Sequence, residues 1–150
     1  MRVVIGSDHA GYDQKERIKA HLAEQGHEVT DVGTANGDES VDYPDYAIAA
    51  SRMVASGSVE MGVLVCGTGI GMAIAANKVR GARAANVTDV EFAHLAREHN
   101  NANIVTVSAR FVPEQVNEDI VDTFLATPFA GGRHAGRVGK ITAVESEERG

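Results

Sequence analysis

The sequence is poor in cysteine and in positive charge. Its 150 residues include one cysteine, Cys66, which excludes an intramolecular disulfide and predicts a cytoplasmic protein. Lysine and arginine number 14 against 21 acidic residues, a net charge of −7, which argues against a nucleic-acid binder because affinity for phosphate backbones depends on clustered basic side chains. No apolar run approaches the roughly 20 residues that span a bilayer, so we expect no membrane partner either.

What the sequence does contain is a regular alternation of short runs of β-branched residues with longer helical patterns. Hydrophobic residues make up 43% of the chain, enough for one core, so we expect residues 1–150 to form a single domain. The patterns predict strands at 3–5, 28–32, 62–65, 82–87 and 104–107, and helices at 13–24, 45–55, 72–77, 90–97, 113–125 and 133–148. This alternation predicts an α/β fold, a Rossmann-like doubly wound sheet of about five parallel strands with helices on both faces and ligands beyond the carboxyl ends of the strands.

The last predicted helix, 133–148, carries Val138, Ile141 and Val144 three residues apart. An apolar stripe of this kind on a terminal helix predicts docking, either on its own domain or on a partner subunit.

The strongest local feature is a glycine-rich turn, with Gly67, Gly69 and Gly71 between a buried-type strand and a helix. Backbone N–H groups in such a turn can converge on one negatively charged atom. The spacing fits neither G-x-G-x-x-G nor a nucleotide P-loop. The turn alone is therefore compatible with a dinucleotide site, an oxyanion hole or a tight structural turn.

Cys66 stands on the last strand position before this turn, where a helix N-terminus can stabilise a thiolate. The plainer alternative is a small buried hydrophobe. The neighbouring turn and the Thr68 hydroxyl favour chemistry, because a base beside an oxyanion site is what abstraction of a proton next to a carbonyl requires.

Two further polar clusters have plainer alternatives as well. Asp8 and His9 follow the first strand and could form an acid–base pair or a clamp for phosphate and hydroxyl groups, or Ser7 or Asp8 could merely cap a helix. His99 follows the helix predicted at 90–97 and could exchange a proton at neutral pH, or simply serve as a helix C-cap.

A basic cluster, Arg133, His134 and Arg137, suits a phosphate monoester, with Arg110 as a further contributor. The alternative is a solvated helix face paired with glutamates, namely Glu145, Glu147 and Glu148. Metal dependence is not expected, because Glu91 and His94 lie three apart on a helix but nothing nearby completes a ligand set.

With these clusters in place, the chain resembles the ribose-5-phosphate isomerase B family, which includes the galactose-6-phosphate isomerase subunits, over nearly its whole length. The resemblance rests on Gly6 to Gly11, Asp42 to Pro44, Cys66 to Gly71 followed by Ala75 to Lys78, His99 with Asn100, and Gly131 to His134 with Arg137.

The resemblance implies a metal-independent, cofactor-free aldose–ketose isomerase that interconverts ribose 5-phosphate and ribulose 5-phosphate through an enediolate. It implies Cys66 as the base, with Thr68 and the backbone of Gly67, Gly69, Ile70 and Gly71 holding the enediolate oxygens. Asp8 and His99 would open the sugar ring.

The same resemblance assigns substrate binding. Asn100 would hold sugar hydroxyls and Tyr43 would line the pocket, and the phosphate would be held by His9, Arg110, Arg133, His134 and Arg137. It further implies a homodimer or tetramer with the active site at the subunit interface. The alternatives are the same reaction on a tetrose or hexose phosphate, such as allose or galactose 6-phosphate, or a non-catalytic phosphate- or nucleotide-binding module.

Overall fold

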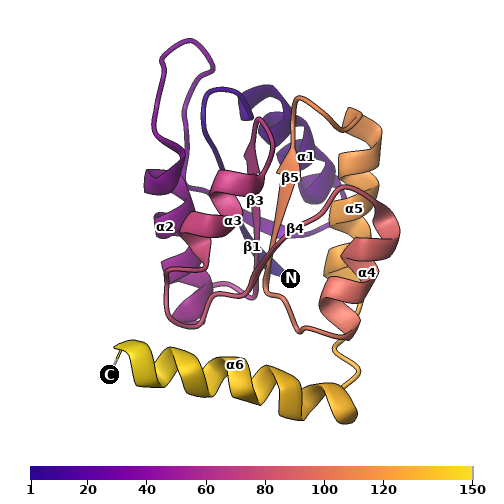
Figure 1. Cartoon of the computed structure of the whole chain (residues 1–150). Helices are drawn as coiled ribbons and strands as arrows, with labels where there is room; N and C mark the ends of the chain where they lie inside the picture. Colours follow the sequence, from indigo (N-terminus) through magenta and orange to yellow (C-terminus); the bar gives the residue numbers. More distant parts are fainter. Residues whose placement is uncertain (150) are drawn as a thin grey trace.

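The computed structural model describes residues 1–149 and contains a five-stranded sheet in which every strand pair is parallel. The strands are β1 (Arg2–Ser7), β2 (Glu28–Asp31), β3 (Met61–Cys66), β4 (Ala84–Asn86) and β5 (Ile104–Ser108). The helices are α1 (Tyr12–Glu24), α2 (Tyr43–Ala55), α3 (Ile70–Ala76), α4 (Val90–Glu98), α5 (Glu114–Ala126) and α6 (Arg133–Arg149). The strand order is β2-β1-β3-β5-β4, so the predicted doubly wound parallel sheet is confirmed (Figure 1).

The central strands are buried on both faces because most of their residues are apolar, as is usual in parallel sheets. Odd-numbered side chains such as Val63 and Val65 pack with α1, α4 and α5, and even-numbered ones such as Leu64 and Cys66 pack with α2 and α3. Cys66 therefore points to the same face of the sheet as α3, the helix that directly follows it.

The connections from β1 and β3 run in opposite directions across the sheet. The chain leaves β1 through α1 to reach β2 on one side, and leaves β3 through α3 to reach β4 on the other. Between the carboxyl ends of β1 and β3 the two loops diverge, and this switch point is where open α/β sheets bind ligands. The loops that flank it are residues 8–11 and 67–69.

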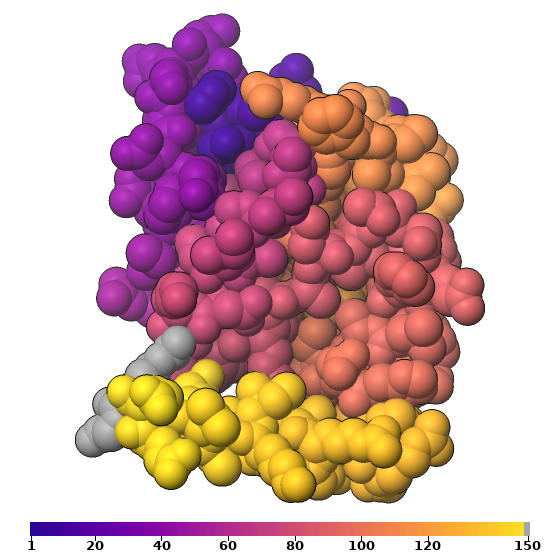
Figure 2. Space-filling view, in the orientation of Figure 1, coloured from indigo at the N-terminus to yellow at the C-terminus, as the bar shows by residue number. Residues whose placement is uncertain are grey.

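The last helix, α6, lies below the amino ends of the strands (Figure 1) and covers the bottom of the molecule in Figure 2. Glu145 accepts a hydrogen bond from the backbone N–H of Gly81 at 2.8 Å, and Val138 is buried. Docking of this helix on its own domain is thus confirmed. Ile141 and Val144 remain 53% and 55% exposed, so packing of that stripe on a partner subunit stays a prediction.

Among residues 1–149, no helix combines the length and apolar character needed to cross a membrane.

Candidate active site

A cavity of about 420 Å³ opens beside Cys66 at the carboxyl end of β3. It is lined by Tyr43, Cys66, Gly67, Thr68, Ile70, Gly71, Ile74 and Arg110. Seven of these eight residues, Cys66 among them, were predicted for the site from the sequence. Ile74 was not.

The thiol is buried and its sulfur accepts a hydrogen bond from the N–H of Gly69, with 3.1 Å between N and Sγ. An N–H donor aimed at sulfur stabilises the charged thiolate more than the neutral thiol. Thr68 lies next to it, and its Oγ1 accepts the N–H of Ile70 at 3.1 Å. The Thr68 hydroxyl hydrogen is thus left available to donate to a bound oxygen.

Backbone contacts fix the direction of the Gly67–Thr68 peptide. The Gly67 carbonyl accepts the Ser108 hydroxyl at 2.7 Å and the Arg110 N–H at 3.1 Å. Because C=O and N–H point in opposite directions in a trans peptide, the Thr68 N–H is directed away from β5. Ser108 was not predicted from the sequence, where it directly follows the strand expected at 104–107.

Two side chains close over the glycine turn. A Cβ at Gly71 would lie 2.5 Å from Cε1 of Tyr43, and a Cβ at Gly67 would lie 3.2 Å from Nη1 of Arg110. Gly71 therefore allows a close approach that any larger residue would block, whereas at Gly67 a Cβ would require only a small shift of the guanidinium. The phenol ring and the guanidinium thereby border the thiol pocket from α2 and from the loop after β5.

Asp8 and His9 occupy the neighbouring loop, on the same edge of the sheet, as expected. Oδ1 of the buried Asp8 accepts the N–H of Gly11 at 3.0 Å. Gly11 is the N-cap residue of α1 and no side chain caps this helix, so the capping alternative is wrong for Asp8. It is wrong for Ser7 as well, whose buried Oγ has no hydrogen-bond partner within the described chain. Nδ1 of His9 accepts the N–H of Val41 at 3.1 Å, which leaves Nε2 as its donor.

His99 and His134 form a second group. Their rings stack, with centroids 4.2 Å apart and an interplanar angle of 14°. His99 is the C-cap residue of α4, and its Nε2 lies 3.4 Å from Oε1 of Glu98. Burial, followed by the charges of His99, Arg133 and Arg137, lowers the pKa of His134.

Arg133 and Arg137 are exposed at the start of α6. None of the ion pairs within residues 1–149 joins them to Glu145, Glu147 or Glu148, so the alternative of a self-paired helix face is wrong. Two unpaired guanidiniums beside His134 form a compact basic surface suited to a phosphate.

This second group lies at the opposite ends of the strands from the thiol pocket, so the two cannot form one site within a single chain. Helix α4 runs back from the carboxyl end of β4, so His99 and Asn100 lie at the amino ends of the strands, where α6 also begins (Figure 1). The expectation that Arg110 joins the basic cluster of α6 therefore fails within one chain, because Arg110 lies over Gly67 at the other edge.

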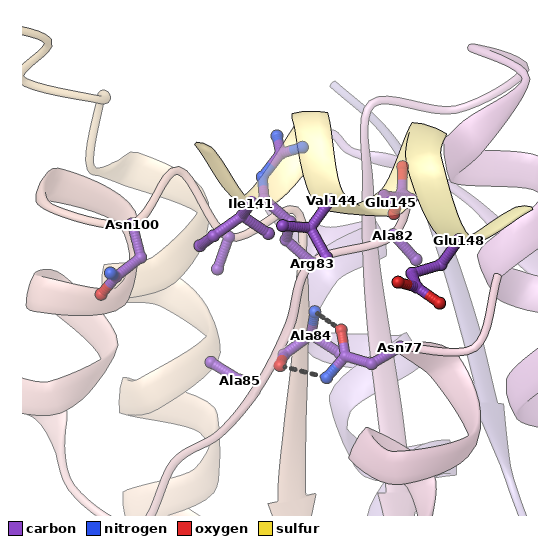
Figure 3. Close-up of a pocket in the computed structure, with 11 residues that line it drawn as sticks. Asn77, Ala82, Arg83, Ala84, Ala85, Asn100, Ile141, Val144, Glu145 and Glu148 are labelled. Carbon is purple, nitrogen blue, oxygen red and sulfur yellow. Dashed lines mark hydrogen bonds between the residues drawn. The ribbon is translucent and has the colours of Figure 1, made fainter. Parts of the chain in front are cut away.

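Asn100 borders a groove of about 520 Å³ between α6 and the edge strand β4 (Figure 3). Its lining is mostly apolar, with Ala82, Ala84, Ala85 and Ala102 from the sheet side and Ile141 and Val144 from the helix. The Asn77 side chain binds the first residue of β4, because its Oδ1 accepts the Ala84 N–H at 2.8 Å and its Nδ2 donates to the Ala84 carbonyl at 2.9 Å. No group of three or more His, Cys, Asp or Glu side chains in the described chain could hold a metal ion.

Comparison with protein families matches residues 3–141 to a family described as Ribose/Galactose Isomerase. A curated relative, ribose-5-phosphate isomerase B of Escherichia coli, is 44% identical over 144 residues, which cover 96% of each chain.

Solved structures agree with this match. The chain superposes on ribose-5-phosphate isomerase B of Clostridium thermocellum with a TM-score of 0.96, 48% identity and 99% of each chain covered. It superposes on the Mycoplasma genitalium enzyme with bound ribulose-5-phosphate with a TM-score of 0.94, 44% identity and 97% of each chain covered.

Proposed function

Because this chain belongs to the ribose/galactose isomerase family, we propose that it interconverts ribose 5-phosphate and ribulose 5-phosphate, with residues 1–150 acting as one isomerase domain. The observation that carries the proposal is the position of Cys66, a thiol that accepts a backbone N–H beside Thr68 and Arg110 in an open cavity. A thiol that served only to fill the core would need neither the donor nor the cavity.

The isomerisation moves one proton between adjacent carbons. The Cys66 thiolate removes the proton from C2 of the open-chain aldose, and the electron pair of that C–H bond forms the C1–C2 double bond of an enediolate. The thiol returns the proton to C1 while the hydroxyl proton of O2 passes to O1, so that C2 becomes the carbonyl carbon and no oxidant or reductant is consumed. The Thr68 hydroxyl and the N–H groups of the turn stabilise the negative oxygens as they develop.

One chain supplies only half of this machinery, so the active unit is a homodimer or a higher oligomer. Asp8, His9 and Arg110 lie on the carboxyl edge with Cys66, and the second group lies on the amino edge. A partner copy that docks its amino edge over Cys66 would contribute five residues: His99 to open the ring with Asp8, Asn100 to hold hydroxyls, and Arg133, His134 and Arg137 to hold the phosphate with His9 and Arg110. A two-fold axis completes both sites at once.

The exposed apolar surface fits this docking. Ile70 and Ile74 on α3, 54% and 60% exposed, border the thiol pocket. The groove beside Asn100 is lined by alanines, Ile141 and Val144. In an antiparallel pair of copies, α3 of each can fill the groove of the other and remove both surfaces from water.

Catalysis by a thiolate also requires Cys66 to remain reduced, which suits the cytoplasm.

The test is the steady-state kcat/KM of wild type and Cys66→Ser, with EDTA present, on four-, five- and six-carbon aldose phosphates. We expect wild type to prefer ribose 5-phosphate, and Cys66→Ser to lose about 10²- to 10⁴-fold because a positioned base has been removed. A wild type that prefers allose or galactose 6-phosphate would keep the reaction but change the substrate. Turnover by Cys66→Ser at the wild-type rate would refute the role of the thiol, and no turnover of any sugar phosphate would refute the isomerase.

A further inference from the structure

Lys15 is a lysine whose whole side chain is withdrawn from solvent. Its relative exposure is 0%, and it heads the ranking of fully buried side chains by volume in the described chain. A buried ammonium group is stable only where its charge is paired and its N–H donors are used. The proposed reaction does not use this group, so its buried charge serves another purpose in the structure.

The ammonium holds the point where the chain leaves β2. Nζ of Lys15 donates to both carboxylate oxygens of Asp31, at 2.9 Å each, and to the carbonyl oxygen of Thr34 at 2.7 Å. Oδ1 of Asp31 also accepts the N–H of Gly33 at 2.9 Å. One cation therefore anchors both sides of the turn at residues 31–34.

This turn is attached to the strand end that carries Asp8 and His9. The Ser7 N–H donates to the Gly33 carbonyl at 2.8 Å, and the Thr34 N–H donates to the Ser7 carbonyl at 2.9 Å. The position of Thr34 thereby sets where segment 35–42 begins relative to the loop after β1.

Segment 35–42 then reaches the substrate-binding side chains. The Val41 N–H donates to Nδ1 of His9, and Tyr43, two residues further on, stands over Gly71 beside the thiol pocket. Figure 1 shows this segment as a long loop rising above α2 with no helix or strand of its own. A loop of this length depends on a few anchors to hold a single position.

We propose that Lys15 is a positioning residue for substrate binding. Its buried ammonium fixes the Thr34 carbonyl, so that segment 35–42 holds His9 and presents Tyr43 at the thiol pocket. This inference rests on the proposed isomerase function and adds to it a residue that touches neither the substrate nor Cys66.

The test compares three variants with wild type. Lys15→Met removes the ammonium and keeps an unbranched apolar chain of similar length. Lys19→Met is the matched control, because Lys19 also binds Asp31 at 2.9 Å but is partly exposed and makes no bond to Thr34. Lys15→Met combined with Asp31→Asn also removes the carboxylate, which the single substitution would leave with only Lys19 as a cationic partner among the described residues, so this double variant tests the role of Lys15 if Lys15→Met alone does not fold.

The readouts are kcat and KM for ribose 5-phosphate and hydrogen exchange of peptides from segment 35–42. We expect the folded Lys15 variants to raise KM about tenfold or more while kcat changes less, because misplaced binding groups weaken attachment of the substrate. Exchange should accelerate in segment 35–42 and stay slow in β1, β3 and β5, and Lys19→Met should behave as wild type.

Wild-type KM together with unchanged exchange in the double variant would overturn the role of Lys15, as would an equal rise in KM in Lys19→Met. Failure of the proposed function looks different, because wild type itself would then turn over no sugar phosphate.

Discussion

Substitution of Gly71 by alanine should impair substrate binding while leaving the fold intact. The added Cβ would lie 2.5, 2.7 and 3.0 Å from three ring atoms of Tyr43, where ordinary contacts need more than about 3.4 Å. The ring must therefore move by about 1 Å or more. Tyr43 is 40% exposed, so it can swing outward, away from the thiol pocket, at little cost.

The two effects on free energy have opposite signs. Alanine is favoured over glycine in the middle of a helix by about 0.5 to 1 kcal/mol, and this sets an upper limit for Gly71, which is the second residue of α3. The stability of the variant should thus be unchanged or slightly raised. If Tyr43 contacts the substrate as we propose, loss of that contact costs about 0.5 to 1.5 kcal/mol, which corresponds to a fall in kcat/KM of roughly two- to tenfold.

The assay is a double-mutant cycle on kcat/KM with Gly71→Ala, Tyr43→Ala and the double variant, accompanied by thermal unfolding of each. If Gly71 acts through the Tyr43 ring, the double variant should be no worse than Tyr43→Ala alone. Losses that multiply across the two substitutions, or a marked drop in the melting temperature of Gly71→Ala, would refute this reasoning.

Three further predictions concern charge and assembly. Burial opposes ionisation of Asp31, but hydrogen bonds from Lys19, Lys15 and Gly33 outweigh it and lower its pKa. Its carboxylate therefore adds stability that is complete above its ordinary pKa of 3.8 and is lost as the pH falls toward the lowered value. The free energy of unfolding of Asp31→Asn, measured in urea, should therefore fall less than that of wild type as the pH is lowered. An identical pH dependence in the two proteins would contradict this prediction. Arg110→Met should raise KM about 10- to 100-fold because a charge-assisted contact to phosphate is lost, and an unchanged KM would remove Arg110 from the phosphate site. Ile74→Asp should weaken self-association about a hundredfold or more in analytical ultracentrifugation, whereas a dimer as tight as wild type would place the interface elsewhere.

The fold and the thiol pocket were accessible from the sequence because both depend on local patterns. Short runs rich in β-branched residues, such as 62–65 and 104–107, alternate with helical patterns and are typical of central strands of a parallel sheet, and the glycine turn after Cys66 directly follows one of them. β4 was predicted too long, at 82–87. Its edge position leaves three paired residues, Ala84 to Asn86, whose ladder ends at both sides in loops.

The resemblance implied a site at the subunit interface, but which residues lie at which end of the sheet was not predicted, although the signal was present. A helix that follows a parallel strand returns toward the amino edge, so His99 at the end of α4 could not lie beside Cys66 at the end of β3. Motif order along the chain gives no direction in space, whereas the direction of each strand places a residue at one end of the sheet or the other.

The buried position of Lys15 is also indicated by the sequence. It lies three residues before Ile18 and seven before Leu22, on the apolar stripe of α1, where a lysine needs a buried partner. The partner, Asp31, is 16 positions away and could be identified only from the packing of α1 on β2.

The exposure of Ile70 and Ile74 could not be predicted from the sequence, because an apolar residue in a helix is ordinarily assigned to the core.

A mixed dimer tests the central claim, that each active site joins Cys66 of one copy to His99 of another. Cys66→Ala and His99→Ala chains with different affinity tags are co-expressed, and the species carrying both tags is isolated. One of its two sites would then contain both native residues, so we predict about half of the wild-type kcat per dimer, although each parent variant alone is nearly inactive. A mixed dimer as inactive as its parents, with both chains folded, would contradict a shared site.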